Sequence, residues 1–63
     1  MTTEHEQAMA ERVRQACIEA ALAGYEDASM SGLCAEGALE VAISAVRGID
    51  LEPLLNASQG SDD

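Results

Sequence analysis

Basic residues and large aromatic residues are scarce in this sequence of 63 residues. It has no lysine, phenylalanine or tryptophan, and Tyr25 is its one aromatic residue. Three arginines stand against twelve acidic residues, which gives a formal charge of −9. Because no basic patch exists to neutralise phosphates, we expect binding neither to nucleic acid nor to anionic membrane surfaces.

Metal-binding and disulfide-forming residues are also few. The chain has two cysteines, Cys17 and Cys34, and one histidine, His5. A closed zinc site needs four nitrogen or sulfur ligands, so we expect no metal ion. If the chain folds as a helical hairpin, Cys34 lies level with residue 27, on the order of 15 Å along the helix from Cys17. That distance is too long for a disulfide, and two free thiols predict a reduced, cytoplasmic protein.

Motifs that carry enzymatic chemistry are missing. The sequence has no glycine-rich phosphate loop, no nucleophile elbow and no Glu-x-x-His pairs for a di-metal bundle. It also has no signal-peptide-like segment and no apolar run of about 18 residues that would cross a membrane. We therefore expect a cytoplasmic protein without enzymatic activity, metal ion or cofactor.

The residues that are present predict an all-α fold. Alanine is abundant, and β-branched residues are too few and too poorly alternated for a sheet. We expect a first helix from about Thr3 to about Ala28, capped by Thr2 or Thr3. Gly32 suits the left-handed conformation that ends such a helix, and Ser29 or Ser31 is expected to cap the next one. One face of the first helix is formed mainly of small residues, which allow a second helix to approach closely: Met9, Val13, Ala16, Cys17, Ala20 and Gly24.

The second predicted helix, residues 32–48, is apolar around most of its circumference. Its polar residues, Glu36, Glu40, Ser44 and Arg47, fall within an arc of roughly 80°. Apolar residues cover the remaining arc of about 240°, whereas packing on one core needs only about 100°. This helix therefore needs neighbours on more than one side.

A short third segment follows. Asp50 is expected to cap one helical turn that contains Pro53, and the leucines of this segment either fold back over Ile18 and Leu22 or dock on a second subunit. The predicted architecture is an antiparallel αα-hairpin with a short C-terminal helical turn in residues 1–56, followed by a disordered acidic tail in residues 57–63.

The excess of apolar residues predicts a homodimer in which two hairpins form a four-helix bundle. We expect aspartate at Leu39 or Ile43 to disrupt assembly and folding together. The residues predicted to form the interface are Ile18, Leu22, Tyr25, Leu39, Ile43, Val46, Ile49, Leu51, Leu54 and Leu55.

Cys34 is the strongest candidate for a reactive thiol. It is predicted to lie in the first turn of the second helix, where the helix dipole lowers a thiol pKa. The alternative is that it is a small buried hydrophobic residue, as expected for Cys17 on the small-residue face. No histidine or arginine is predicted near either cysteine, so a catalytic thiol lacks a partner.

Residues 25–47, YEDASMSGLCAEGALEVAISAVR, resemble a segment of short uncharacterised bacterial helical proteins, a likeness that brings no assigned site residues. The sequence predicts a small acidic protein–protein interaction module, an adaptor or regulator that contacts itself and a further, basic partner protein. Three alternatives remain open. The first is an acidic inhibitor that mimics nucleic acid and blocks a DNA- or RNA-binding protein, and the second is a redox or thiol-transfer protein that uses Cys34. The third is a subunit or accessory domain of a larger complex.

Overall fold

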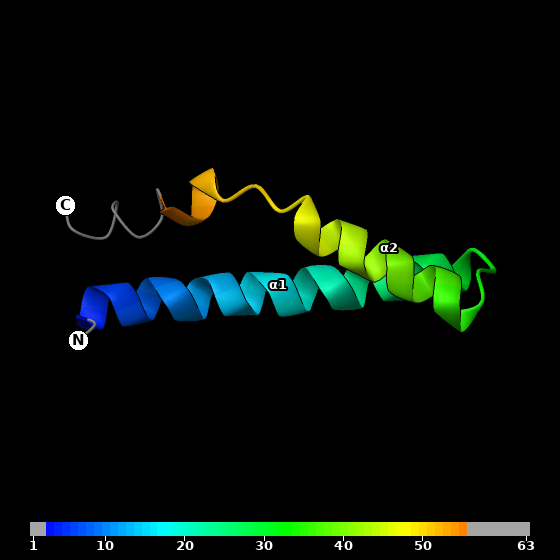
Figure 1. Cartoon of the computed structure of the whole chain (residues 1–63), viewed down its shortest axis with the longest axis horizontal. Coiled ribbons are helices and arrows are strands. Elements are labelled where there is room, and N and C mark those ends of the chain that lie inside the picture. The colour runs from blue at the N-terminus through cyan, green and yellow to red at the C-terminus, as the bar shows by residue number, and fades with distance from the viewer. Residues whose placement is uncertain (1–2, 56–63) are drawn as a thin grey trace.

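The computed structural model describes residues 3–55 and shows a hairpin of two antiparallel helices (Figure 1). Helix α1 spans Glu4–Met30, helix α2 spans Ala35–Arg47, and one further helical turn covers residues 52–55. The described residues contain no strand, so the predicted all-α hairpin is confirmed. The predicted tail, residues 57–63, lies outside the described part of the chain.

Helix α1 begins with a reciprocal cap. The Thr3 side-chain oxygen accepts a hydrogen bond from the Glu6 backbone N–H at 3.1 Å, and the Glu6 carboxylate accepts one from the Thr3 N–H at 2.9 Å. The acidic side chains of Glu4 and Glu6 also lie at the positive end of the helix dipole. The sequence left Thr2 and Thr3 open as caps, and the structure assigns the role to Thr3.

The two helices are joined by a tight turn at Gly32, which has the predicted positive φ of 99°. The N–H of Leu33 donates to the carbonyl of Ala28, and the N–H of Gly32 donates to that of Ser29, both at 3.0 Å. These two bonds form a Schellman motif, which satisfies carbonyls that the end of α1 would leave unpaired. Helix α1 consequently extends two residues beyond the predicted Ala28.

The predicted cap of α2 is wrong. Ser31 is the C-cap of α1, and the N-cap of α2 is Cys34, whose side chain makes no capping hydrogen bond. Cys34 therefore precedes the helix instead of lying within its first turn. The reason is that the Schellman motif extends as far as Leu33, which leaves one residue before α2 begins.

The contact between the helices is made by glycine and alanine. A Cβ atom on Gly24 would lie 3.2 Å from the Cβ of Ala45 and 3.3 Å from the Cα of Ala42. The buried side chains among residues 3–55 are also alanines, Ala28, Ala38 and Ala42. Small side chains let the two backbones approach closely, as predicted for this face of α1, but they bury little apolar area.

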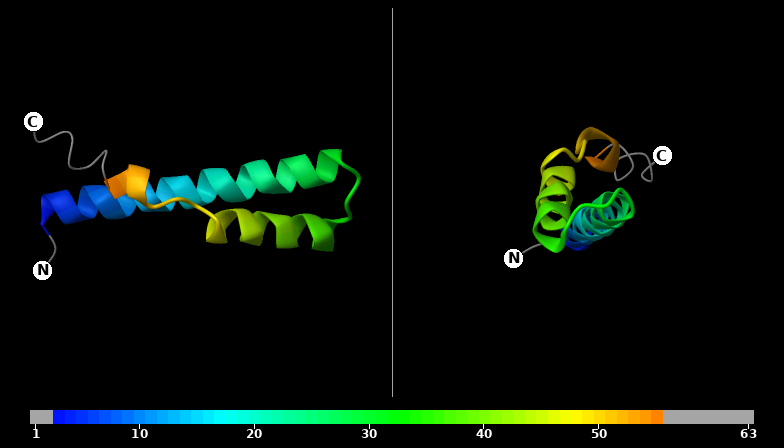
Figure 2. Two further views of the ribbon diagram at one scale, coloured as in Figure 1. Left: turned by 90° about the horizontal axis from the view of Figure 1, so that it is seen from above. Right: turned by 90° about the vertical axis from the view of Figure 1, so that its right-hand side faces the viewer.

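The chain after α2 returns along the N-terminal half of α1 (Figures 1 and 2). Asp50 accepts a hydrogen bond from the Glu52 N–H at 3.2 Å, which confirms the predicted cap of the short turn. Because Gly24 faces Ala42 and Ala45, α2 ends level with about residue 20 of α1. Met9 and Val13 lie beyond that point and are half-buried. The ribbon of the returning chain runs beside this half of α1 (Figure 2).

The predicted alternative that the C-terminal leucines cover Ile18 and Leu22 is wrong, since both of those side chains are exposed. The returning chain crosses α1 on another side, where Met9, Arg12 and Val13 are half-buried.

Gly24 gives a direct test of the close helix contact. Gly24→Leu places a bulky side chain where a single Cβ already meets α2 within 3.3 Å, so we expect the free energy of unfolding to fall by about 1–3 kcal/mol. Urea unfolding followed by circular dichroism measures the change. Ala23→Leu adds the same side chain at an exposed neighbouring position and should change stability by less than about 0.5 kcal/mol. Equal stability of the two variants would contradict the close contact.

Candidate interaction surface

Large apolar side chains remain on the outside of the hairpin. Ile18, Leu22, Tyr25, Leu39 and Ile43 have exposed fractions between 39% and 61%. With Gly24 directed at α2, a rotation of about 100° per residue places Ile18, Leu22 and Tyr25 at roughly 100–160° around α1. These three residues form one apolar stripe on α1.

Helix α2 carries a matching stripe. With the buried Ala38 directed at α1, Leu39, Ile43 and Val46 lie at roughly 80–140° around α2. Because the two helices run in opposite directions, equal rotations away from their contact bring side chains of both to the same side of the hairpin. We call this surface the apolar face, formed by Ile18, Leu22, Tyr25, Leu39, Ile43 and Val46.

The C-terminal turn lies on the opposite side. The half-buried residues Met9, Arg12 and Val13 are rotated from Gly24 in the other direction, by roughly 20–120°. The end-on view shows residues 52–55 on one side of the two helices, above them in the picture (Figure 2). The apolar face is therefore left uncovered by the described part of the chain.

The other four residues of the predicted interface are not part of the apolar face. Ile49 and Leu54 are half-buried within the chain itself. Leu51 and Leu55 are exposed, but they belong to the C-terminal segment on the opposite side. The structure thus brings six of the ten predicted residues together and separates the other four from them.

One packing contact was not predicted from the sequence. The Leu33 side chain lies over Gly37, where an added Cβ would be 3.3 Å from Leu33 Cδ2. Gly37 therefore leaves room for Leu33 over the first turn of α2. The signal was the spacing of a large apolar residue just before the helix and a glycine four positions later.

Carboxylates border the apolar face on both long edges. Glu19 and Glu26 lie at roughly 200–220° around α1, just beyond Leu22. Glu36 and Glu40 lie at roughly 160–200° around α2, just beyond Ile43. All four side chains are exposed, and none is paired with a cation within residues 3–55.

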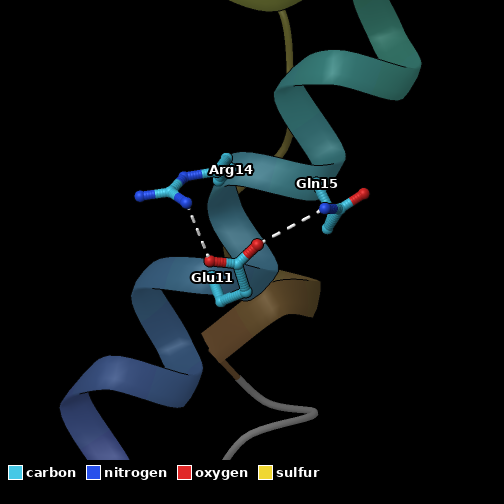
Figure 3. A network of polar contacts seen from close by, with 3 residues as sticks. All are labelled: Glu11, Arg14 and Gln15. Atoms are coloured by element: carbon cyan, nitrogen blue, oxygen red, sulfur yellow. Dashed lines mark hydrogen bonds and ion pairs between the residues drawn. The ribbon is translucent and has the colours of Figure 1, made fainter.

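The arginines leave this border acidic. Arg14 pairs with Glu11 at 3.1 Å, and Gln15 donates a hydrogen bond to the same carboxylate at 3.3 Å (Figure 3). Arg12 is half-buried on the side of the C-terminal turn. Arg47, at the end of α2, is the one cation on the α2 edge among the described residues.

Cys34 is exposed, so the alternative that it is a buried hydrophobic residue is wrong. The Cys34 sulfur makes no capping hydrogen bond, but the nearby backbone N–H groups of Gly37 and, to a smaller extent, Glu36 favour its thiolate and lower the pKa of Cys34. Cys17 is half-buried on the small-residue face of α1. His5 lies in the first turn of α1, at the end of that helix away from Cys34. Residues 3–55 contain no pocket beside the thiol and no group of three potential metal ligands.

The lowered pKa predicts faster alkylation at Cys34 than at Cys17. The thiolate is the reacting form, so the pH at which Cys34 reaches half its maximal rate should lie below that of the same residue in urea-unfolded chain. Iodoacetamide labelling across a pH series, read by peptide mass spectrometry, measures both cysteines in one sample. Equal midpoints for Cys34 in folded and unfolded protein would contradict the stabilisation by backbone N–H groups.

No helix in residues 3–55 has the length and apolarity needed to cross a membrane. The resemblance of residues 25–47 to short bacterial helical proteins stays a prediction. Compared with protein-family models, with curated proteins and with solved structures, the chain matches none of them.

Proposed function

We propose that this chain is a non-enzymatic protein–protein interaction module, an adaptor or regulator that acts by packing helices against its apolar face. The observation that carries the proposal is the division of apolar residues between core and surface. Within residues 3–55 the core consists of Ala28, Ala38 and Ala42, whereas Leu22, Leu39 and other large side chains are exposed. A small chain that keeps its largest apolar side chains outside gains its missing burial from another molecule.

A second copy is one source of that burial, and the homodimeric four-helix bundle is part of this proposal. Covering the exposed half of a leucine or isoleucine contributes about 1 kcal/mol. Each copy has five exposed side chains on its apolar face, so the ten side chains of a dimer contribute about 10 kcal/mol. The cost of association is at least about 4 kcal/mol. The difference is at most about 6 kcal/mol, so self-association with a dissociation constant of tens of micromolar or weaker follows. Two free cysteines suit a reducing, cytoplasmic location.

The spacing of carboxylates gives little support to nucleic-acid mimicry. Along the outer side of α1, Glu11, Glu19 and Glu26 follow one another at intervals of about 10–12 Å. One strand of DNA carries a charge about every 3.4 Å. The acidic residues are too sparse for that pattern, and they flank an apolar surface that a phosphate mimic does not need.

Leu39 tests the proposal. Leu39 is exposed in the single hairpin, so Leu39→Asp should break assembly without disturbing the contact of α1 with α2. The sequence alone led us to expect that folding fails as well, and the exposure of Leu39 removes that part of the expectation. Sedimentation equilibrium over a concentration series that extends to about 1 mM measures the change. The mass of the unmodified chain should rise from 6.6 kDa towards twice that value, whereas the variant should keep the single chain mass throughout.

The matched control is Ser44→Asp, which adds the same charge on the polar side of α2 and should leave self-association within about twofold of the unmodified chain. A folded unmodified chain that sediments at 6.6 kDa at every concentration would refute the homodimer. Equal behaviour of the two variants would refute the assignment of the apolar face.

A further inference from the structure

We propose that the partner best fitted to the apolar face is a basic amphipathic helix, which lies along the seam between α1 and α2 and converts the hairpin into a three-helix bundle. This inference rests on the proposed function and adds the chemistry of the partner. Its apolar stripe would cover the apolar face, and its lysine or arginine side chains would reach the carboxylates on both edges.

The dimensions of the surface fit one helix. The two stripes overlap along the hairpin, since Gly24 faces Ala42 and Ala45 across the contact. Leu22 and Tyr25 lie level with Ile43 and Val46, whereas Leu39 lies nearer the connecting turn and Ile18 just past the end of α2. Helix α2 limits the shared length to 13 residues, or about 20 Å. The six residues of the apolar face extend over about 16 Å from Ile18 to Leu39, and both helices contribute side chains where the two stripes overlap. A partner helix of about four turns is sufficient to cover the apolar face.

The charges specify the sign of that partner. Glu19 and Glu26 are about 10 Å apart on one edge, and Glu36 and Glu40 are about 6 Å apart on the other. The residues that flank the apolar stripe of a docked helix face these two edges. Long basic side chains can lay their carbon stems on apolar surface while their charged ends reach outward. Since the four carboxylates have no cation of their own within residues 3–55, they are available to such a partner.

Charge also separates this partner from a second copy. Both would cover the same apolar side chains, so the apolar contact does not discriminate strongly between them. A second copy brings a further formal charge of −9 and sets its own carboxylate edges near those of the first. A basic helix replaces that repulsion with attraction at both edges. It should therefore displace the second copy.

A synthetic peptide is a suitable probe for the full chain. The test peptide has 16 residues, with leucine on one helical stripe and lysine elsewhere. One control peptide carries glutamate in place of every lysine, and another has the test composition with its leucines spread around the helix. Fluorescence anisotropy of the labelled peptides at about 50 mM and about 200 mM salt measures affinity and its dependence on screening. We expect the test peptide to bind at least about tenfold more tightly than either control, and less tightly at higher salt.

Variants of the chain locate the binding. Leu39→Asp should lower the affinity of the chain for the test peptide at least about tenfold. The double variant Glu36→Gln, Glu40→Gln should lower the affinity for the test peptide severalfold and make that affinity less dependent on salt. Glu4→Gln with Glu52→Gln removes the same charge away from the apolar face and should change affinity less than about twofold.

The outcomes distinguish the two proposals. Equal binding of the acidic peptide, or of the peptide with spread leucines, overturns the basic amphipathic partner. Failure of the test peptide to bind a chain whose self-association still depends on Leu39 overturns it as well, and leaves the second copy as the occupant. If Leu39→Asp alters neither self-association nor peptide binding, the proposed function itself fails.

Discussion

The close approach of two backbones at Gly24 is the constraint on which the rest of the structure depends. It requires glycine and alanine at the contact, because a single added Cβ would already meet Ala42 and Ala45 within 3.3 Å. Small residues stabilise a contact through proximity and good packing, but they remove little apolar area from water. The leucines and isoleucines of both helices are consequently placed outside, and the chain has a core that is separate from its most hydrophobic surface.

Local rules predicted much of this fold. Either Thr2 or Thr3 suits the cap of the first helix, Gly32 marks the left-handed end of a helix, and the small-residue face of α1 follows from helical periodicity. These features depend on neighbours in the sequence, so no tertiary information was needed. Cys34 was misplaced because the Schellman motif continues one residue further than a simple helix end.

The candidate surface was only partly predictable. Periodicity identified Ile18, Leu22, Leu39 and Ile43 as surplus apolar residues, but it did not decide whether the two stripes lie on the same side. That depends on which residues meet at the contact, and Gly24 against Ala45 settles it. The path of the chain after α2 was equally undecided, because the same leucines suit either side of α1. The border of carboxylates around the apolar face became evident only once both stripes were placed.

The turn at Gly32 has a consequence for how quickly the hairpin forms. Residues that meet across the contact lie at nearly equal separations from the turn, as Gly24 and Ala42 do, so each pair closes a loop only slightly longer than the pair before it. The entropy of loop closure therefore rises in small steps as α2 closes onto α1 from the turn outward. A topology of such low contact order is typical of chains that fold in microseconds to milliseconds. The apolar face, which is exposed in the single hairpin, is then complete as a surface almost as soon as the chain has folded.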